Sequence, residues 1–283
     1  ALALVPARDG EDWLRDDEGG AWRAFRYVPG GVARGGVATP AEARAVAAAF
    51  GSFQRQLADL PGPPLREHLP GFHDGRARLA ALHVALAVDR RGRVKGAREE
   101  IAQALAQAHL AEVFPALESR GARPGPVHND TKPDNLLRDE ATGEPLCVID
   151  LDTVMPGWRL ADFGDLARAV CGRVPEDERD LARVTADPEL FAGLAGGFLA
   201  AAGGLLSDAE RAALPDAAMA LAWEQGVRFL ADWLDGDVYY PVRRPEHNLE
   251  RCRAQFALLR SFTAQADALR ERAARLAAGE EPA

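Results

Sequence analysis

Lysine is nearly absent from this chain of 283 residues. Of its 34 basic side chains, only Lys95 and Lys132 are lysines, and 43 acidic side chains bring the net charge to −9. The sequence therefore lacks the basic field that attracts nucleic-acid phosphates, which argues against a nucleic-acid partner. No sequence feature indicates a protein partner.

Cysteine is also scarce. The three cysteines, Cys147, Cys171 and Cys252, show neither metal-ligand spacing nor an even number for full pairing. This usage predicts a reduced, cytoplasmic protein. The N-terminal segment lacks a basic region followed by a long apolar run, and we find no segment of membrane-spanning length. We therefore expect neither export nor membrane insertion.

The most informative stretch that is present carries Asp130 and, five residues later, Asn135. Two apolar runs around a Gly-containing turn follow, which predicts a β-hairpin that ends at Asp150 beside the first loop. Asp130 can accept or orient a hydroxyl proton. Asn135 and Asp150 can bind Mg²⁺, for which few protein oxygens suffice because phosphates and water supply the rest. The pattern predicts a phosphoryl-transfer site that uses ATP and Mg²⁺.

Other carboxylates lie close to this site in the sequence. Asp152 would share the side of Asp150 if the strand extends that far, so we expect it to be a second metal carboxylate. The residues Asp-Phe-Gly that begin at Asp162 spell the metal motif of protein kinases, but they follow a strand-breaking Pro-Gly pair. We therefore interpret Asp162 or Asp165 as a helix N-terminal residue and Asp150 as the metal ligand.

These motifs resemble the aminoglycoside phosphotransferase and choline kinase family. The likeness is carried by the His-x-Asp-x4-Asn motif that ends at Asn135 and by residues 149–157, and it runs from about residue 4 to about residue 262. A second block, residues 227–240 followed by 247–249, is most similar to the N-acetylhexosamine 1-kinase branch. The resemblance implies an ATP-dependent small-molecule kinase.

The family's fold is an α+β, protein-kinase-like, bilobal one, with a small β lobe and a large helical lobe. We expect residues 1–31 to be a remnant of the β lobe with the hinge, and residues 32–283 to form the helical lobe. A complete small lobe offers a glycine-rich loop over the ATP phosphates and a strand lysine, and neither is visible here. We therefore expect an upstream part of this lobe to be missing and the activity of residues 1–283 alone to be low.

Helical spacing dominates the second part of the chain. Thr39 and Glu42 form a capping box that begins a helix of about 18 residues. Further helices are expected over residues 98–119, 188–201, 207–213, 215–235 and 249–278.

Lys132 lies two residues beyond Asp130 and is similar to the lysine that contacts the transferred phosphate in many kinases. Since arginine is the usual cation of this chain, we expect a phosphate role, with a solvated surface charge as the alternative. We expect His128 to fix the loop by packing or hydrogen bonding. The remaining histidines show no ligand pattern, and we expect surface or packing roles for His68, His73, His83, His109 and His247.

The resemblance also implies a substrate side. Arg228 and Tyr239 match the residues that contact the sugar in the N-acetylhexosamine branch. The alternative for Arg228 is an ion pair with Glu224, four residues back on the same helix. Tyr27 and Val28 lie near the expected hinge, where backbone groups would meet adenine.

The sequence thus predicts ATP-dependent phosphorylation of a small hydroxylated metabolite, an N-acetylhexosamine at its anomeric hydroxyl. Three alternatives stay open. The acceptor could be choline, homoserine or an aminoglycoside, or the chain could be a non-catalytic module without a phosphate-binding loop. A metal-dependent phosphoesterase could use two ions held by Asp130, Asp150, Asp152 and His128.

Overall fold

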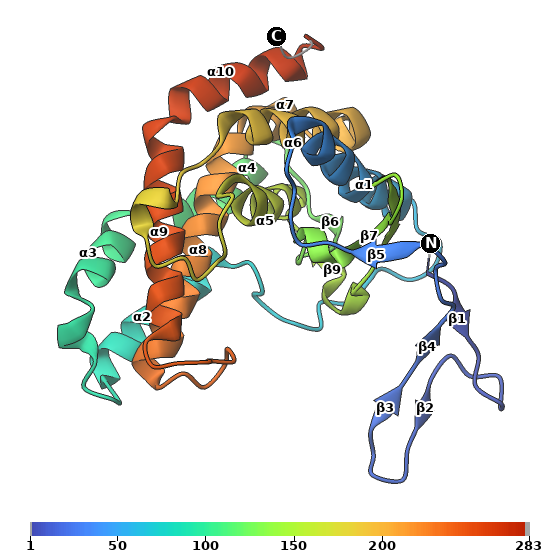
Figure 1. Ribbon diagram of the computed structural model, residues 1–283, viewed down its shortest axis with the longest axis horizontal. Coiled ribbons are helices and arrows are strands. Elements are labelled where there is room, and N and C mark those ends of the chain that lie inside the picture. Colours follow the sequence, from blue (N-terminus) through green and yellow to red (C-terminus); the bar gives the residue numbers. More distant parts are fainter. Residues whose placement is uncertain (1, 281–283) are drawn as a thin grey trace.

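The computed structural model describes residues 2–280, in which short strands come first and helices dominate the rest (Figure 1). The N-terminal strands form two antiparallel pairs. Strand β1 (Leu4–Val5) pairs with β4 (Ala24–Phe25), and β2 (Leu14–Arg15) pairs with β3 (Ala21–Trp22). Together they make a ribbon that projects away from the helices in Figure 1. Large apolar side chains stay exposed along it: Leu4, Val5, Trp13, Leu14 and Trp22.

The predicted hairpin is present and lies in a sheet of order β5-β7-β8. Strand β7 (Leu136–Asp139) pairs with β8 (Pro145–Val148) on one side and with β5 (Gly31–Ala33) on the other. Strand β5 thus spans the expected boundary at residue 31 and pairs with the hairpin of the helical part. The division into two domains at this residue stays a prediction. A separate pair, β6 (Gly125–Val127) and β9 (Met155–Gly157), leads the chain into and out of the catalytic segment.

Helix α1 (Pro40–Ala58) begins with the capping box expected from the sequence, since the side chain of Thr39 accepts from the N–H of Glu42. It packs closely along α6 (Pro188–Ala202). A Cβ at Gly197 would overlap the carbonyl of Arg44 on α1, so the small residue permits contact between the two backbones.

Helix α6 also corrects one expectation. The window Pro188–Leu205 has a mean hydropathy of 1.3 and is long enough to cross a membrane, so our finding of no such segment was wrong. In the structure, Phe191, Leu194 and Phe198 of this helix are buried in the core. A core helix of a globular fold meets the same test of length and composition.

Three helices form the body behind the catalytic segment: α5 (Arg159–Cys171), α8 (Leu214–Asp235) and α9 (His247–Ala264). Helix α8 packs against both of the others, with Trp223 fully buried. The indole Nε1 of Trp223 donates to the carbonyl of Ala104, so this large ring is buried without an unpaired N–H.

The expected helix over residues 98–119 is interrupted. It forms α3 (Arg98–Ala106), a 3₁₀ turn and α4 (Val113–Glu118). Pro115 has no N–H and its ring would clash with a helical carbonyl four residues earlier, which explains a break at this point. The C-terminal helix is also divided, into α9 and α10 (Ala266–Ala277), where the side chain of Gln265 binds the distant carbonyl of Ala186.

Two further helices complete the described chain. Helix α7 (Asp208–Ala212) begins at a Ser207 capping box within the expected range. Helix α2 (Gly75–Val88) was not predicted. Apolar residues occur on several faces of α2, although only Leu82 and Ala85 are buried, so its sequence lacks the one-sided apolar periodicity that marks a surface helix.

Candidate active site

Asp130 lies at the centre of the candidate site, between a cation and an amide. Its Oδ2 accepts from Lys132 Nζ at 2.7 Å and from Asn135 Nδ2 at 2.8 Å. Burial opposes the charge on Lys132, but the bond to Asp130 and the nearby Asp150 outweigh it and raise the pKa of Lys132 above its usual value. The carboxylate therefore sits beside a permanent positive charge, with part of its surface open.

The hairpin brings two of the three expected metal residues, Asn135 and Asp150, to the loop that carries Asp130. The N–H of Ile149 donates to the carbonyl of Asn135 at 2.9 Å, so the end of the hairpin lies against the loop. Asn135 uses its Nδ2 on Asp130, which leaves its amide oxygen for a cation. Asp150 is exposed and takes a left-handed conformation with φ of 60°. An amide oxygen and a carboxylate are hard donors that fit Mg²⁺.

Asp152 does not lie where the strand argument placed it. Strand β8 ends at Val148, and a 3₁₀ turn over Leu151–Thr153 follows, so the expected alternation with Asp150 is wrong. The Asp152 carboxylate instead forms an exposed ion pair with Arg23. Its proposed role as a second metal ligand therefore has no support from strand geometry.

Asp162 lies in the first turn of its helix, as expected, but its carboxylate does not bind the free N–H groups of that helix. Helix α5 begins at Arg159, and the buried Asp162 carboxylate accepts from the backbone N–H groups of His128 at 2.9 Å and Asn129 at 2.7 Å. The side chain of Gln54 supplies a third bond at 2.7 Å. Burial raises the pKa of Asp162, although these bonds and His128 oppose the shift. Asp162 therefore holds the backbone that leads into Asp130.

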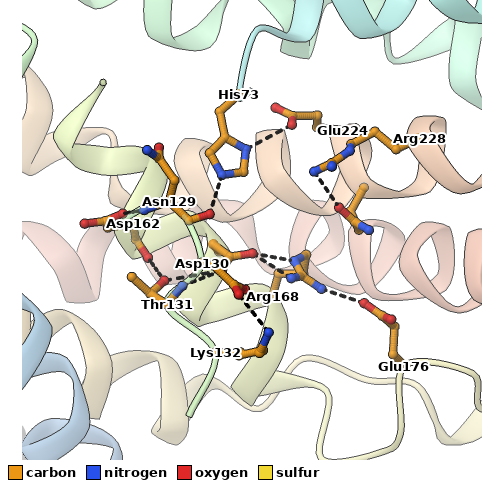
Figure 2. Close-up of polar contacts among 12 residues, drawn as sticks. His73, Asn129, Asp130, Thr131, Lys132, Asp162, Arg168, Glu176, Glu224 and Arg228 are labelled. Atoms are coloured by element: carbon orange, nitrogen blue, oxygen red, sulfur yellow. Dashed lines mark hydrogen bonds and ion pairs between the residues drawn. The ribbon is translucent and has the colours of Figure 1, made fainter. Parts of the chain in front are cut away.

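The next carboxylate of α5 holds the other side of the loop. Asp165 Oδ2 accepts from the N–H of Thr131 at 2.8 Å, and Asp165 Oδ1 accepts twice from Arg168. Burial alone would raise the pKa of Asp165, but Arg168, His73 and the Thr131 N–H outweigh it and lower that pKa. Asp130 is thus flanked in the chain by residues whose backbone groups bind buried carboxylates (Figure 2).

His128 is structural, as the sequence analysis expected. Its ring is fully buried against Phe50 and Phe53, and its Nε2 lies 2.9 Å from the carbonyl of Ile149. Its Nδ1 accepts from the N–H of Asp130. His128 therefore joins the loop to the end of the hairpin.

His73 is a residue that the sequence analysis missed. Its Nδ1 lies 3.0 Å from a carboxylate oxygen of Glu224 on α8, and its Nε2 lies 2.9 Å from the carbonyl of Asn129 (Figure 2). Both partners are acceptors, so both ring nitrogens must carry protons for both bonds to form. Burial opposes this charge, but Glu224 and then Asp165 outweigh it and raise the pKa of His73.

No local pattern could have identified His73. It is separated from Asn129 by 56 residues and from Glu224 by 151 residues. The alternative of an Arg228–Glu224 ion pair is not found, because Glu224 binds His73 and Arg228 donates to Gln225 at 3.3 Å. Glu224, which lies four residues before Arg228 on the same helix, therefore binds His73 instead of Arg228.

The two expected sugar residues lie on one aromatic cluster. The Arg228 guanidinium lies over the rings of Phe72 and Tyr240, at 5.2 and 5.7 Å from their centroids. The ring of Tyr239 packs edge-on against Tyr240, with centroids 4.8 Å apart, and 68% of Tyr239 is exposed. Arg228 and Tyr239 are thus brought together through Tyr240.

The two expected adenine contacts lie on the segment before β5. Tyr27 is 82% exposed, whereas Val28 is partly buried and its carbonyl accepts from the N–H of Gly31. This turn leads into the strand that pairs with the hairpin, and so it lies on the hairpin side of the site.

Comparison with known proteins agrees with these motifs. The model of a phosphotransferase enzyme family matches residues 5–196. A microcompartment-associated aminopropanol kinase is 17% identical, with a TM-score of 0.57 over 95% of this chain and 76% of that chain. An aminoglycoside phosphotransferase from Alicyclobacillus acidocaldarius subsp. acidocaldarius is 18% identical, with a TM-score of 0.56 over 98% of this chain and 77% of that chain.

A choline/ethanolamine kinase family protein from Mesorhizobium loti is 16% identical, with a TM-score of 0.54 over 99% of this chain and 79% of that chain. At such low identities the likeness establishes the fold alone. The expected fold, mostly helical, α+β and protein-kinase-like, is confirmed.

Proposed function

Since this chain belongs to the phosphotransferase enzyme family, we propose that it transfers the terminal phosphoryl group of ATP to a small metabolite, an N-acetylhexosamine at its anomeric hydroxyl. The observation that carries the proposal is the position of Asp130 between Lys132 and Asn135, on a loop held by buried side chains. Phosphoryl transfer depends mainly on positioning and charge stabilisation, which such a loop supplies.

Each residue of the centre has a task that its contacts support. Asp130 accepts or orients the proton of the acceptor hydroxyl. Lys132 balances the Asp130 charge and is free at its exposed end to contact a phosphate oxygen. Asn135 and Asp150 would hold Mg²⁺, which when bound neutralises charge on the phosphates. Tyr27 and Val28 remain our proposed contacts for adenine, and Asp152 stays a proposed second carboxylate.

Two observations support the sugar as acceptor. The Arg228 guanidinium makes one hydrogen bond within the described residues, to Gln225, so other N–H groups are available for hydroxyl or N-acetyl oxygens. The exposed ring of Tyr239 offers an apolar face and a hydroxyl beside it. We also propose a cytoplasmic location, since Cys147, Cys171 and Cys252 are all buried and free.

The test is an acceptor screen on the protein expressed from its complete reading frame. Purified protein is given Mg-ATP with N-acetylglucosamine, N-acetylgalactosamine, choline, ethanolamine, homoserine or an aminoglycoside, and ³¹P NMR identifies the product. We expect an anomeric sugar phosphate that is absent with Asp130→Asn. Transfer to an amino alcohol alone would refute the sugar, and transfer to none of these acceptors by folded protein would count against this kinase assignment.

A further inference from the structure

A partly open cavity of about 250 Å³ lies next to the catalytic loop. Lys132 lines it, and the same side chain is bonded to Asp130, so the cavity is one side chain away from the proposed base. The other walls come from the end of α5, the segment that follows it and one face of α9. Neither Arg228 nor Tyr239 is among the lining residues in the part of the chain that the structure describes.

One wall of the cavity holds a buried amide with an unused oxygen. Gln255 on α9 lines the cavity and is 4% exposed, and its Oε1 is enclosed by protein atoms without a hydrogen-bond partner among residues 2–280. Leaving a buried polar atom unpaired costs roughly 1–3 kcal/mol, so such atoms require an explanation. A side-chain amide offers an acceptor at one end and two donors at the other. Rotation of the Gln255 amide would bring this oxygen, or the amide N–H groups, to the cavity, where a ligand could bind it.

The charges around the cavity cancel. Lys132 and Arg168 oppose Asp134 and Glu176, and Arg168 is itself bonded to Glu176 at 2.9 Å. No aromatic side chain lines the cavity within the described chain. A cationic acceptor requires an uncompensated carboxylate or a free aromatic face, and the cavity provides neither among the groups described.

Two aromatic rings that are connected to Glu176 through Arg251 already carry guanidinium groups. Glu176 lies 3.9 Å from Arg251, whose guanidinium is 5.4 Å from the centroid of Phe229. Phe229 packs against Tyr240, which carries Arg228. An ammonium ligand would have to compete with these guanidinium groups for the same ring faces.

We propose that this cavity binds an uncharged, hydrogen-bonding part of the acceptor, which Gln255 recognises through its side-chain amide. The inference rests on the proposed kinase function and adds where the uncharged part of the acceptor binds and which residue recognises it. The volume lies just below the range of about 300–1,000 Å³ that is typical of drug-sized ligands, and so suits a small metabolite. Apolar walls suit an N-acetyl methyl group, and they are formed by Val174, Pro175, Val184, Ala254 and Leu258.

Binding can be tested without catalysis. Methyl-labelled residues 1–283 are titrated with N-acetylglucosamine and, separately, with choline, while the methyl resonances of Leu258 are followed by NMR. We expect saturable shifts at Leu258 with the sugar and none with choline. A response to choline alone, or no response to N-acetylglucosamine, would overturn the proposal even if the protein proves to be a kinase.

Catalysis gives the second test, on the protein expressed from its complete reading frame. Gln255→Leu keeps the approximate size but removes the amide, and we expect the KM for N-acetylglucosamine to rise roughly tenfold, as for one lost hydrogen bond, with the KM for ATP unchanged. Gln107→Leu, which removes an amide outside this cavity, is the matched control. Gln255→Glu adds a carboxylate and should move preference toward choline.

The outcomes separate this inference from the proposed function. Sugar phosphorylation with an unchanged acceptor KM in both folded Gln255 variants would overturn the role of the cavity and leave the kinase intact. Sugar-dependent shifts at Leu258 that disappear in Gln255→Leu, without phosphoryl transfer to any acceptor, would support the cavity and refute the kinase. Melting temperatures of the variants exclude misfolding as the cause.

Discussion

The catalytic loop and the N-terminal strands are built in opposite ways, although neither contains long regular structure. The backbone of the loop over residues 128–135 is hydrogen-bonded to three buried side chains: Asp162, Asp165 and His73. The strands from Leu4 to Phe25 bond mainly to each other and expose their apolar side chains. Irregular backbone is therefore no guide to rigidity. What matters is whether its polar groups have buried partners.

This contrast locates the source of the site's geometry. The groups that position Asp130 lie on α5, on α8 and in the segment between α1 and α2, all of them in the helical part. Charge stabilisation is effective when donors and acceptors are fixed before the reaction begins. The helical part can therefore position the catalytic carboxylate without any contact from residues 2–25.

The largest expected effect concerns Asp130 itself. Asp130→Asn keeps the side chain's size and an oxygen that can accept from Lys132, but it removes the carboxylate. We expect turnover to fall roughly 10²-fold or more with little change in melting temperature. Steady-state kinetics of the active protein provide the measurement, with Asp208→Asn on the exposed start of α7 as the control. Near-normal turnover would remove Asp130 from the mechanism.

The second prediction tests whether the loop depends on its buried anchors. Asp162→Ala leaves the N–H groups of His128 and Asn129 without an acceptor, so we expect the free energy of unfolding to fall by about 2–3 kcal/mol. Asp150→Ala, at an exposed position, should leave stability nearly unchanged and abolish Mg²⁺-dependent nucleotide binding. Urea unfolding and nucleotide titration distinguish them. The reverse pattern would make Asp162 the metal ligand.

Much of this site could be predicted from the spacing of residues that lie near one another in the sequence. The spacing of Asp130 and Asn135, with a hairpin that returns to them, is local information, and the sequence was sufficient to predict that these residues and Asp150 lie together. The capping box at Thr39 is equally local. Local rules failed where a tertiary partner intervenes, as at Asp162. It was expected to stabilise its own helix but binds backbone 33 and 34 residues away.

The anchors themselves could not be predicted from one sequence. His73 precedes a helix with little amphipathic pattern, and both of its partners are distant in the chain. Gln255 is one polar residue on a mostly buried helix, and only the packing of α9 beside the loop places it at a cavity. Such features arise from where helices meet, for which periodicity carries no information.

The third prediction uses the charge on His73. Its pKa is raised in the folded state, so the folded protein holds this proton more tightly than the unfolded chain does. The resulting stability is fully present below a pH of about 6.5, the usual value for histidine, and is lost as the pH rises through the raised folded value. Glu224 and Asp165 favour the charge on His73, and Glu224 also acts on the nearby Arg78, whose pKa burial and Arg228 lower.

The measurement compares unfolding of the wild-type protein with that of a double variant, His73→Gln with Glu224→Gln, across pH 6 to 9. The variant keeps hydrogen-bonding groups at both positions but cannot titrate there. We expect the wild-type protein to lose stability relative to the variant as the pH rises. A difference that stays constant over the whole range would show that His73 is neutral in the folded protein.

The smallest effect is expected where the two regions touch. Arg23 on the N-terminal ribbon pairs with Asp152, and both side chains are largely exposed, at 44% and 66%. Exposed ion pairs contribute about 0–1 kcal/mol and are screened by salt, so Arg23→Ala should lower the free energy of unfolding by less than about 1 kcal/mol at low salt and by nothing measurable at 1 M NaCl. A larger loss that persists in salt would mean that the ribbon packs on the catalytic half, and the contrast between the two regions would fail. If stability is unchanged but Mg-ATP binding weakens in Arg23→Ala, the arginine acts on phosphate instead, which would make the ribbon part of the nucleotide site.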